Sequence, residues 1–331
     1  MPVIDVHTHM LNRQWLALLQ QRGPPKYTVS RSLEGQETIL SEGAQFLTPM
    51  PAHLDYELRL KRMDEARVDL AIVSLTAPNV FFGDEQDSIA AARLVNDDMA
   101  QAQRTWPDRI RWLASLPWEY PNAAIEELAR AHRGGAVGVM VLANINGRPL
   151  TEEAFGPVWR AIDALGLPVL VHPTTPPGAV AMQLDEFMLA SAVGFMVDTT
   201  LAIARMIFSG FLDTYPNLKI IASHAGAALP YIIGRFDRMH EMRAAARTGI
   251  KEKPSLYLRR IYYDAVTYRL DALNLCLDIG GADKLMYGSD FPHNIGDMKG
   301  CLARVDALPA AQVKAVRSAN AERIFKLYGR T

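Results

Sequence analysis

Short apolar runs alternate with longer amphipathic stretches along almost the whole chain. Runs such as residues 69–75 and 136–141 are nearly free of polar interruptions, which is typical of parallel strands buried on both faces. Between the runs, apolar residues recur at helical spacing, as in residues 122–133. The pattern predicts eight strands, each followed by at least one helix: residues 3–9, 69–75, 110–114, 136–141, 168–172, 218–224, 260–264 and 284–290.

Strands that alternate with helices predict a parallel sheet, and eight such units fit a closed (β/α)8 TIM barrel. An open, doubly wound sheet is the alternative, but no glycine-rich phosphate-binding turn follows the first strand. We therefore expect a single α/β domain over residues 1–331. It is a TIM barrel distorted by an insertion at about 11–53 and by extra C-terminal helices near 296–307 and 310–325.

The insertion follows the first strand and interrupts the alternation. It contains Arg22-Gly23-Pro24-Pro25 and short alternating patches at 27–29 and 38–40. These features predict a loop with a small hairpin. Because long insertions in compact domains are often functional, this segment is a candidate lid.

Composition narrows the classes of partner. The formal net charge of −1 provides no basic field that would attract nucleic acid. Cys276 and Cys301 are the only cysteines, which indicates a reduced, cytoplasmic protein rather than a disulfide-stabilised one. The most apolar stretch, residues 187–211, contains Asp198 and Arg205. We interpret it as a buried or partner-facing helix and expect no membrane span.

The first predicted strand ends in two histidines, His7 and His9, separated by Thr8. Side chains at i and i+2 of a strand point the same way, so the two imidazoles can reach one point in space. Neutral imidazole is a common ligand of zinc and related metals. A solvated pair at a strand edge is the alternative interpretation, because a bare H-x-H motif is only a hypothesis.

Three further metal-competent side chains end predicted strands: His172, His224 and Asp290. Each alone is more often structural, since His172 could be a core residue and Asp290 could cap a turn. In a (β/α)8 barrel, however, the C-terminal ends of the strands share one mouth, where active sites are built. Their joint placement with the H-x-H pair predicts a metal-dependent active site.

Four motifs carry a family resemblance. They are His7-x-His9, Val171-His172-Pro173, the SHAG sequence at 223–226 and the GSDFP sequence at 288–292. Together they resemble the amidohydrolase superfamily, and more narrowly its branch of 2-amino-3-carboxymuconate-6-semialdehyde decarboxylase and related aromatic acid decarboxylases. The resemblance spans nearly the whole chain.

The resemblance implies that His7, His9, His172 and Asp290 bind one divalent ion, with a water molecule in the open position. The H-x-H form and the imidazole-rich ligand set favour zinc, with manganese as the alternative. His224, assisted by Asp290, would be the catalytic histidine that accepts a proton from the metal-bound water. No lysine ends the fourth strand, so a two-metal site built on a carbamylated lysine is not supported.

The resemblance also bears on substrate binding. Arg235 would hold a substrate carboxylate, and the matching arginine of the branch reaches into a neighbouring subunit, which implies a homodimer. The alternative is a surface arginine paired with Asp237. Phe291 and His293 are candidates to line the pocket. Near Leu47 and Ser191, the enzyme that names the branch has an arginine and a tryptophan, so its own substrate is not implied here.

Two enzymatic functions fit these residues. The first is non-oxidative decarboxylation of an aromatic or ring-derived unsaturated carboxylic acid, a small-molecule substrate. The second is hydrolysis of a lactone, an amide or a vinylogous carbon–carbon bond on the same scaffold. A non-enzymatic metal-binding protein is a third possibility, but an open ligand set with an extra histidine is a poor match to a closed structural site.

Overall fold

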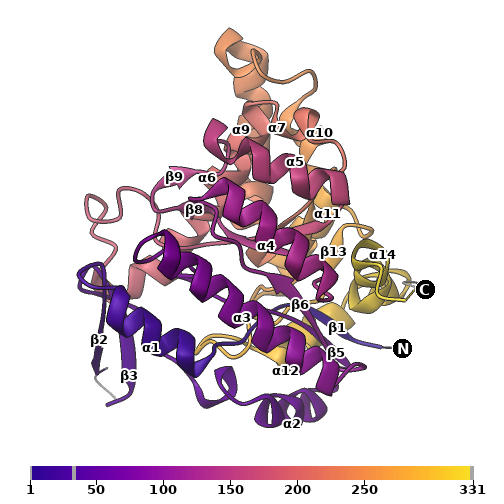
Figure 1. Cartoon of the computed structure of the whole chain (residues 1–331). Coiled ribbons are helices and arrows are strands. Elements are labelled where there is room, and N and C mark those ends of the chain that lie inside the picture. Colours follow the sequence, from indigo (N-terminus) through magenta and orange to yellow (C-terminus); the bar gives the residue numbers. More distant parts are fainter. Residues whose placement is uncertain (1, 32–34, 329–331) are drawn as a thin grey trace.

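A computed structural model describes residues 2–31 and 35–328. It contains an eight-stranded parallel sheet with helices around it (Figure 1). Neighbouring strands follow one another in chain order: β1 (Ile4–His9), β5 (Leu70–Ser74), β6 (Ile110–Ala114), β7 (Gly138–Leu142), β10 (Pro168–His172), β11 (Lys219–Ala222), β12 (Tyr262–Asp264) and β13 (Leu285–Met286). This order is that of a (β/α)8 barrel, and it confirms the predicted fold class.

Main-chain contacts join the last strand to the first. The amide of Val6 donates to the carbonyl of Tyr287 at 3.0 Å, and the amide of Asp290 donates to the carbonyl of His7 at 2.8 Å. A bridge between Thr8 and Phe291 continues the pairing. The sheet therefore curves round until its two edges meet, which brings Asp290 next to the histidines of β1.

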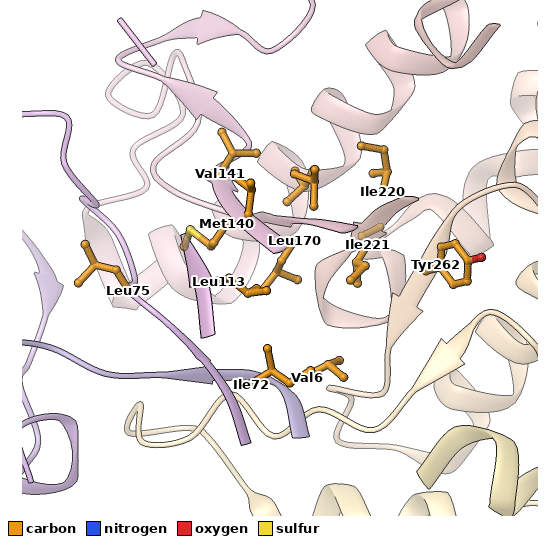
Figure 2. Packing of buried hydrophobic residues seen from close by; sticks show 14 of the residues in the cluster. Val6, Ile72, Leu75, Leu113, Met140, Val141, Leu170, Ile220, Ile221 and Tyr262 are labelled. Carbon is orange, nitrogen blue, oxygen red and sulfur yellow. The ribbon is translucent and has the colours of Figure 1, made fainter. Parts of the chain in front are cut away.

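The strands are buried because helices cover their outer faces and apolar side chains fill the interior. Leu113, Met140 and Leu170 come from neighbouring strands and lie close together (Figure 2). All five residues of β5, of β7 and of β10 are buried. The covering helices include α2 (Tyr56–Ala66), α3 (Glu85–Thr105), α4 (Pro121–Arg133), α5 (Gly156–Leu165), α6 (Phe195–Phe208), α7 (Phe211–Thr214), α9 (Leu229–Met242), α10 (Pro254–Leu258), α11 (Leu270–Gly280), α12 (Met298–Asp306), α13 (Ala310–Lys314) and α14 (Asn320–Phe325).

The insertion is more ordered than the predicted loop and hairpin. It begins with a helix, α1 (Arg13–Arg22), whose N-terminus is capped by the Asn12 side chain and whose Trp15 and Leu19 are buried. An antiparallel sheet of three strands follows: β2 (Tyr27–Arg31), β3 (Glu37–Ser41) and β4 (Ala44–Leu47). The β2–β3 pair is the expected hairpin, and its tip lies outside the described residues.

The apolar segment predicted as one long helix is interrupted. A 3-10 turn, η3 (Glu186–Met188), and a π-helical turn, η4 (Ala190–Gly194), precede α6, and Phe187 has a φ of 52° that breaks the helix. By length and composition alone, Glu186–Phe208 could cross a membrane. Asp198, however, is buried within it, and its carboxylate accepts hydrogen bonds from the Thr174 amide and the Asn144 side chain, both at 2.9 Å. This side of α6 is therefore packed on the barrel.

Candidate active site

Four side chains from three strand ends converge at the mouth of the barrel. One ligand atom from each of His7, His9, His172 and Asp290 lies within 4.8 Å of those of the other three, and all four residues are buried. The Asp290 Oδ1 atom lies 3.1 Å from His9 Nε2 and 3.4 Å from His7 Nε2. The structure thus brings together the four predicted metal ligands. His224, which was predicted at the same mouth, lies beside them and is described below.

Each of these imidazoles is held through one ring nitrogen. His7 Nδ1 lies 2.6 Å from the Asp264 carboxylate, and His172 Nδ1 lies 2.8 Å from the carbonyl oxygen of Pro173. Within the described part of the chain, the Nε2 atoms of His7 and His172 are buried without a hydrogen-bond partner. A buried nitrogen without a partner is costly unless something binds it, and ligating histidines are usually oriented through their other nitrogen. The residues present therefore fit a divalent metal.

Burial sets the charge of the ligands. It lowers the pKa of His9 to about 3 and that of His172 well below its usual value, so both rings are neutral near pH 7. Burial alone would raise the pKa of Asp290, but the surrounding histidines, His293 first, hold it well below the usual range. His7 differs: burial alone would lower its pKa, but Asp264 raises it above its ordinary value, so this ring would give up its proton when a metal binds. Neutral His9 and His172 beside an anionic Asp290 are already in the protonation states that a metal requires.

Asp264 is a site residue that the pattern of histidines did not reveal. It is fully buried at the end of β12. Burial alone would raise its pKa, but the charge of His7 and the hydrogen bonds from His7 and the Val266 amide, acting with other nearby groups, lower it. Besides His7, its carboxylate accepts the main-chain amides of His224 at 3.0 Å and Ala225 at 3.1 Å. One side chain therefore orients a candidate metal ligand and the turn that carries His224. The signal was present in the sequence, because Asp264 also ends a predicted strand.

Replacing Asp264 by asparagine is expected to lower metal affinity by about 10–100-fold, because residues that orient a ligating histidine typically contribute that much. Metal titration of the purified variant, followed by elemental analysis, measures the effect. Asp278→Asn is the matched control, since that side chain is exposed on α11. Unchanged affinity in a folded Asp264→Asn protein would show that Asp264 does not support the metal site.

His224 lies on a tight turn directly after β11. Its backbone has φ 54° and ψ 50°, and Ala225 has φ 53°, a conformation that costs free energy and is held here by Asp264. The ring is largely buried, and its Nε2 atom lies 3.7 Å from Asp290 Oδ2. His224 is therefore next to the four ligands and also faces the pocket described next.

A cavity of about 600 Å3 opens from these side chains. His172, His224 and Asp290 line its inner end together with Thr76 and His293. The remaining wall is mostly apolar and comes from β4 of the insertion, from η4 and α6, and from the starts of α9 and α11. The insertion thus contributes to the pocket. Leu47 and Ser191, the two positions at which the sequence departs from the enzyme that names the branch, both line it.

The predicted substrate contacts have different surroundings. His293 lines the cavity, and its Nε2 atom lies 3.0 Å from Thr76 Oγ1. Phe291 is not among the residues that line the cavity, and its ring centre lies 5.1 Å from the guanidinium of Arg59. Arg235 is exposed on α9 and does not line the cavity of its own chain. Its role and that of Phe291 therefore stay predictions.

Arg59 is a second residue that the sequence did not single out. It is fully buried, it donates to Thr8 Oγ1 at 2.7 Å and to the carbonyl oxygen of His9, and burial lowers its pKa to about 10. It therefore braces the end of β1 behind the candidate metal ligands. An arginine within an amphipathic helix normally faces solvent, so the sequence offered no signal for this position.

Comparisons with known proteins agree with this site. The amidohydrolase family model matches residues 4–327. Over 300 residues, the chain is 28% identical to 2-amino-3-carboxymuconate-6-semialdehyde decarboxylase of Dictyostelium discoideum, covering 89% of this chain and 83% of that protein. It is 31% identical over 293 residues to gamma-resorcylate decarboxylase of Rhizobium radiobacter, covering 83% and 88%.

A solved structure is similar over almost the whole chain. 5-Carboxyvanillate decarboxylase of Novosphingobium aromaticivorans, in complex with manganese and 4-hydroxy-3-methoxy-5-nitrobenzoic acid, has a TM-score of 0.83 at 27% identity. The match covers 98% of this chain and 96% of that one. A barrel that gathers three histidines and an aspartate at its strand ends is characteristic of metal-dependent enzymes. The chain belongs to the amidohydrolase family, as its motifs predicted.

Proposed function

We propose that the protein is a metal-dependent, non-oxidative decarboxylase of an aromatic or ring-derived unsaturated carboxylic acid. One observation carries the proposal: His224 faces a mostly apolar cavity, and His172 and Asp290 lie at the inner end of that cavity. The three relatives described above are decarboxylases of ring-derived or aromatic acids by name. We further propose that residues 1–331 form a single domain, and that the four clustered side chains bind the metal.

The reaction requires a proton but no oxidant. The bond between the ring carbon and the carboxylate carbon breaks, its electron pair takes up a proton at the ring carbon, and carbon dioxide leaves. His224 is positioned to hold that proton, because its Nε2 atom lies 3.7 Å from the Asp290 carboxylate and the ring lines the cavity. His293, on the same wall, would orient the substrate through its ring.

The metal that we propose is zinc. Three imidazoles and one carboxylate suit a tetrahedral zinc ion, whereas the manganese of the 5-carboxyvanillate enzyme is the alternative. When bound, the ion would supply Lewis-acid chemistry and orient the oxygen atoms of the substrate. Elemental analysis of the protein purified without added metal distinguishes the two ions.

A reaction in D2O tests proton delivery. The product is expected to carry deuterium at the ring carbon that lost its carboxylate, and Asp108→Asn, an exposed substitution, should give the same label. His224→Gln should form the labelled product far more slowly. A labelled product formed equally fast by His224→Gln would contradict the role of His224.

We also propose a homodimer in which Arg235 serves the site of the neighbouring subunit. The described residues that line the cavity include no lysine or arginine, so a single chain offers no guanidinium for a carboxylate. Tyr231, Arg235, Met239 and Met242 follow one another at helical spacing on α9, and all four are exposed. An apolar stripe with one arginine, beginning at a residue of the pocket wall, fits an interface next to the active site.

Mixing two impaired variants tests this arrangement. Arg235→Ala is expected to lower kcat/KM by about 10–100-fold, the usual effect of losing a charged hydrogen bond. When Arg235→Ala protein is mixed with His224→Ala protein and the subunits exchange, the mixture should regain part of the wild-type turnover. Each mixed dimer contains one complete site, in which one subunit supplies His224 and the other supplies Arg235. Arg238→Ala, an exposed neighbour, is the control. A monomer in solution, or no recovery in demonstrated mixed dimers, would contradict the proposal.

A cytoplasmic location is the proposal that fits the cysteines best. Cys276 and Cys301 are both free and buried. Burial raises the pKa of the Cys301 thiol to about 12, which keeps it in the unreactive protonated form. Free thiols of this kind are compatible with a reducing compartment.

A further inference from the structure

We propose that the natural substrate is a monocarboxylic aromatic acid with a large, uncharged, apolar substituent, such as an alkyl chain of several carbons or a second ring. The inference rests on the proposed decarboxylase function and concerns the outer part of the same cavity. We call this part the outer wall. Its apolar side chains are Phe46, Met188, Phe195, Met196, Leu275 and Ile295. The polar side chains of Gln45, Tyr231 and Asn294 that also line the cavity are uncharged amides and a phenol.

The size of the cavity is the first argument. A cavity of roughly 150 Å3 is sufficient for one benzene ring. The cavity here measures about 600 Å3. With its carboxylate at the metal-binding end, a single-ring acid would leave most of this space to water. Because water against apolar side chains is unfavourable, a substituent that fills the space gains binding free energy.

The chemistry of the outer wall is the second argument. Its six apolar side chains are aliphatic, aromatic or thioether groups contributed by β4, η3, α6, α11 and the loop after β13. Aromatic and methionine side chains together form an adaptable surface for apolar groups. Within the described part of the chain, Asp290 is the only carboxylate that lines the cavity, and the cavity has no lysine or arginine. Its other acid–base groups are the imidazoles of His172, His224 and His293. The neighbouring subunit's Arg235 is proposed above to bind the reacting carboxylate, so a second carboxylate on the substrate would lack a cationic partner.

The hydroxyl groups around the outer wall are the third argument. Ser191 Oγ donates to the carbonyl oxygen of Met188 at 3.1 Å, and Thr267 Oγ1 donates to that of Arg269 at 3.1 Å. Tyr268 Oη donates to the carbonyl oxygen of Ile295 at 2.8 Å. These hydroxyls are satisfied within the protein, so they do not require a polar ligand. The Tyr268 bond also links two loops of the mouth, which gives the wall a defined shape.

The test compares acids that differ only in the substituent. The zinc-loaded protein is assayed with 2-hydroxybenzoate and with its 4-butyl and 4-phenyl derivatives, because position 4 lies opposite the carboxylate and points away from the metal end. We expect kcat/KM to be at least about tenfold higher for the substituted acids, since even one methylene in an apolar pocket changes it by about 10–200-fold.

A variant that fills the outer part of the cavity provides the matched comparison. Ala272 is exposed on α11 and lines the cavity, so Ala272→Trp places a large ring there without disturbing the core. We expect the ratio of kcat/KM for the 4-butyl acid to that for 2-hydroxybenzoate to fall by about tenfold or more. Ala303→Trp, at an exposed position of α12 outside the cavity, should keep the wild-type ratio.

Binding of the products gives a second measurement that does not depend on turnover. Calorimetry should show tighter binding of 3-butylphenol than of phenol to the wild-type protein, and Ala272→Trp should remove the difference. Equal turnover of all three acids, or preference for a dicarboxylate, would overturn the inference while leaving the decarboxylase function intact. Release of carbon dioxide from none of the acids, alongside selective binding of 3-butylphenol, would instead contradict the proposed function.

Discussion

Replacing His224 by alanine is expected to lower kcat by about 100–10,000-fold, the usual contribution of a general acid or base, while the protein keeps its metal. Two observations separate His224 from the ligands. It lies outside the group of four whose ligand atoms are mutually close, and its ring faces the cavity from a strained turn. Steady-state kinetics and elemental analysis of the same preparation measure both quantities.

His240→Ala is the matched control, because that histidine lies on α9 outside the cavity and should change neither quantity. Two results would count against the assignment. If His224→Ala loses its metal, His224 is a ligand rather than a proton carrier. If it keeps both metal and turnover, the catalytic proton comes from another group.

Replacing His9 or Asp290 by alanine is expected to remove the metal and, with it, the activity. Loss of a residue that merely orients a ligand typically costs 10–100-fold in metal affinity, so loss of a ligand should cost more than about 100-fold. Each substitution also leaves a buried cavity among the remaining histidines, which adds to the effect. Elemental analysis and a titration with zinc measure the loss.

Asp108→Ala replaces an exposed carboxylate that is not among the candidate ligands, so this variant should bind metal as the wild type does. The thermal stability of each variant must be followed, because a bound metal stabilises the folded state. The variants are expected to be less stable than the zinc-loaded wild type and similar to the wild type treated with chelator. Full metal content in His9→Ala or Asp290→Ala would contradict the ligand assignment.

Much of the fold could be predicted because the barrel is built from regular units. Strands buried on both faces are continuous apolar runs, and β5 and β7 have no exposed residue. The helix α1 was not predicted, although Trp15, Leu16 and Leu19 recur at helical spacing after the Asn12 cap, because the Gly23-Pro24-Pro25 turn directly after it indicated a loop. The break at Phe187 was also missed, since an apolar stretch gives no sign of where a helix is interrupted.

The candidate metal ligands could be predicted for a geometric reason. Parallel strands of a barrel end at one mouth, so residues as distant as His7 and Asp290 meet once the strand ends are known. Asp264 was missed although it ends a predicted strand, because its role depends on facing His7 after folding. Arg59 was missed because its role depends on facing the end of β1. The role of Arg235 could not be settled from the sequence or from one folded chain, because the proposed contact of this side chain is with a second copy of the protein.

The protein is expected to release carbon dioxide from an aromatic acid only when its metal is bound. The direct measurement is an assay of the purified protein with a panel of hydroxybenzoates and carboxymuconate-type acids, before chelation, after chelation and after zinc is restored. We predict release that disappears with the chelator and returns with zinc. Bound metal and cleavage of lactones or amides, with no carbon dioxide from any acid, would contradict the account and identify the protein as a hydrolase.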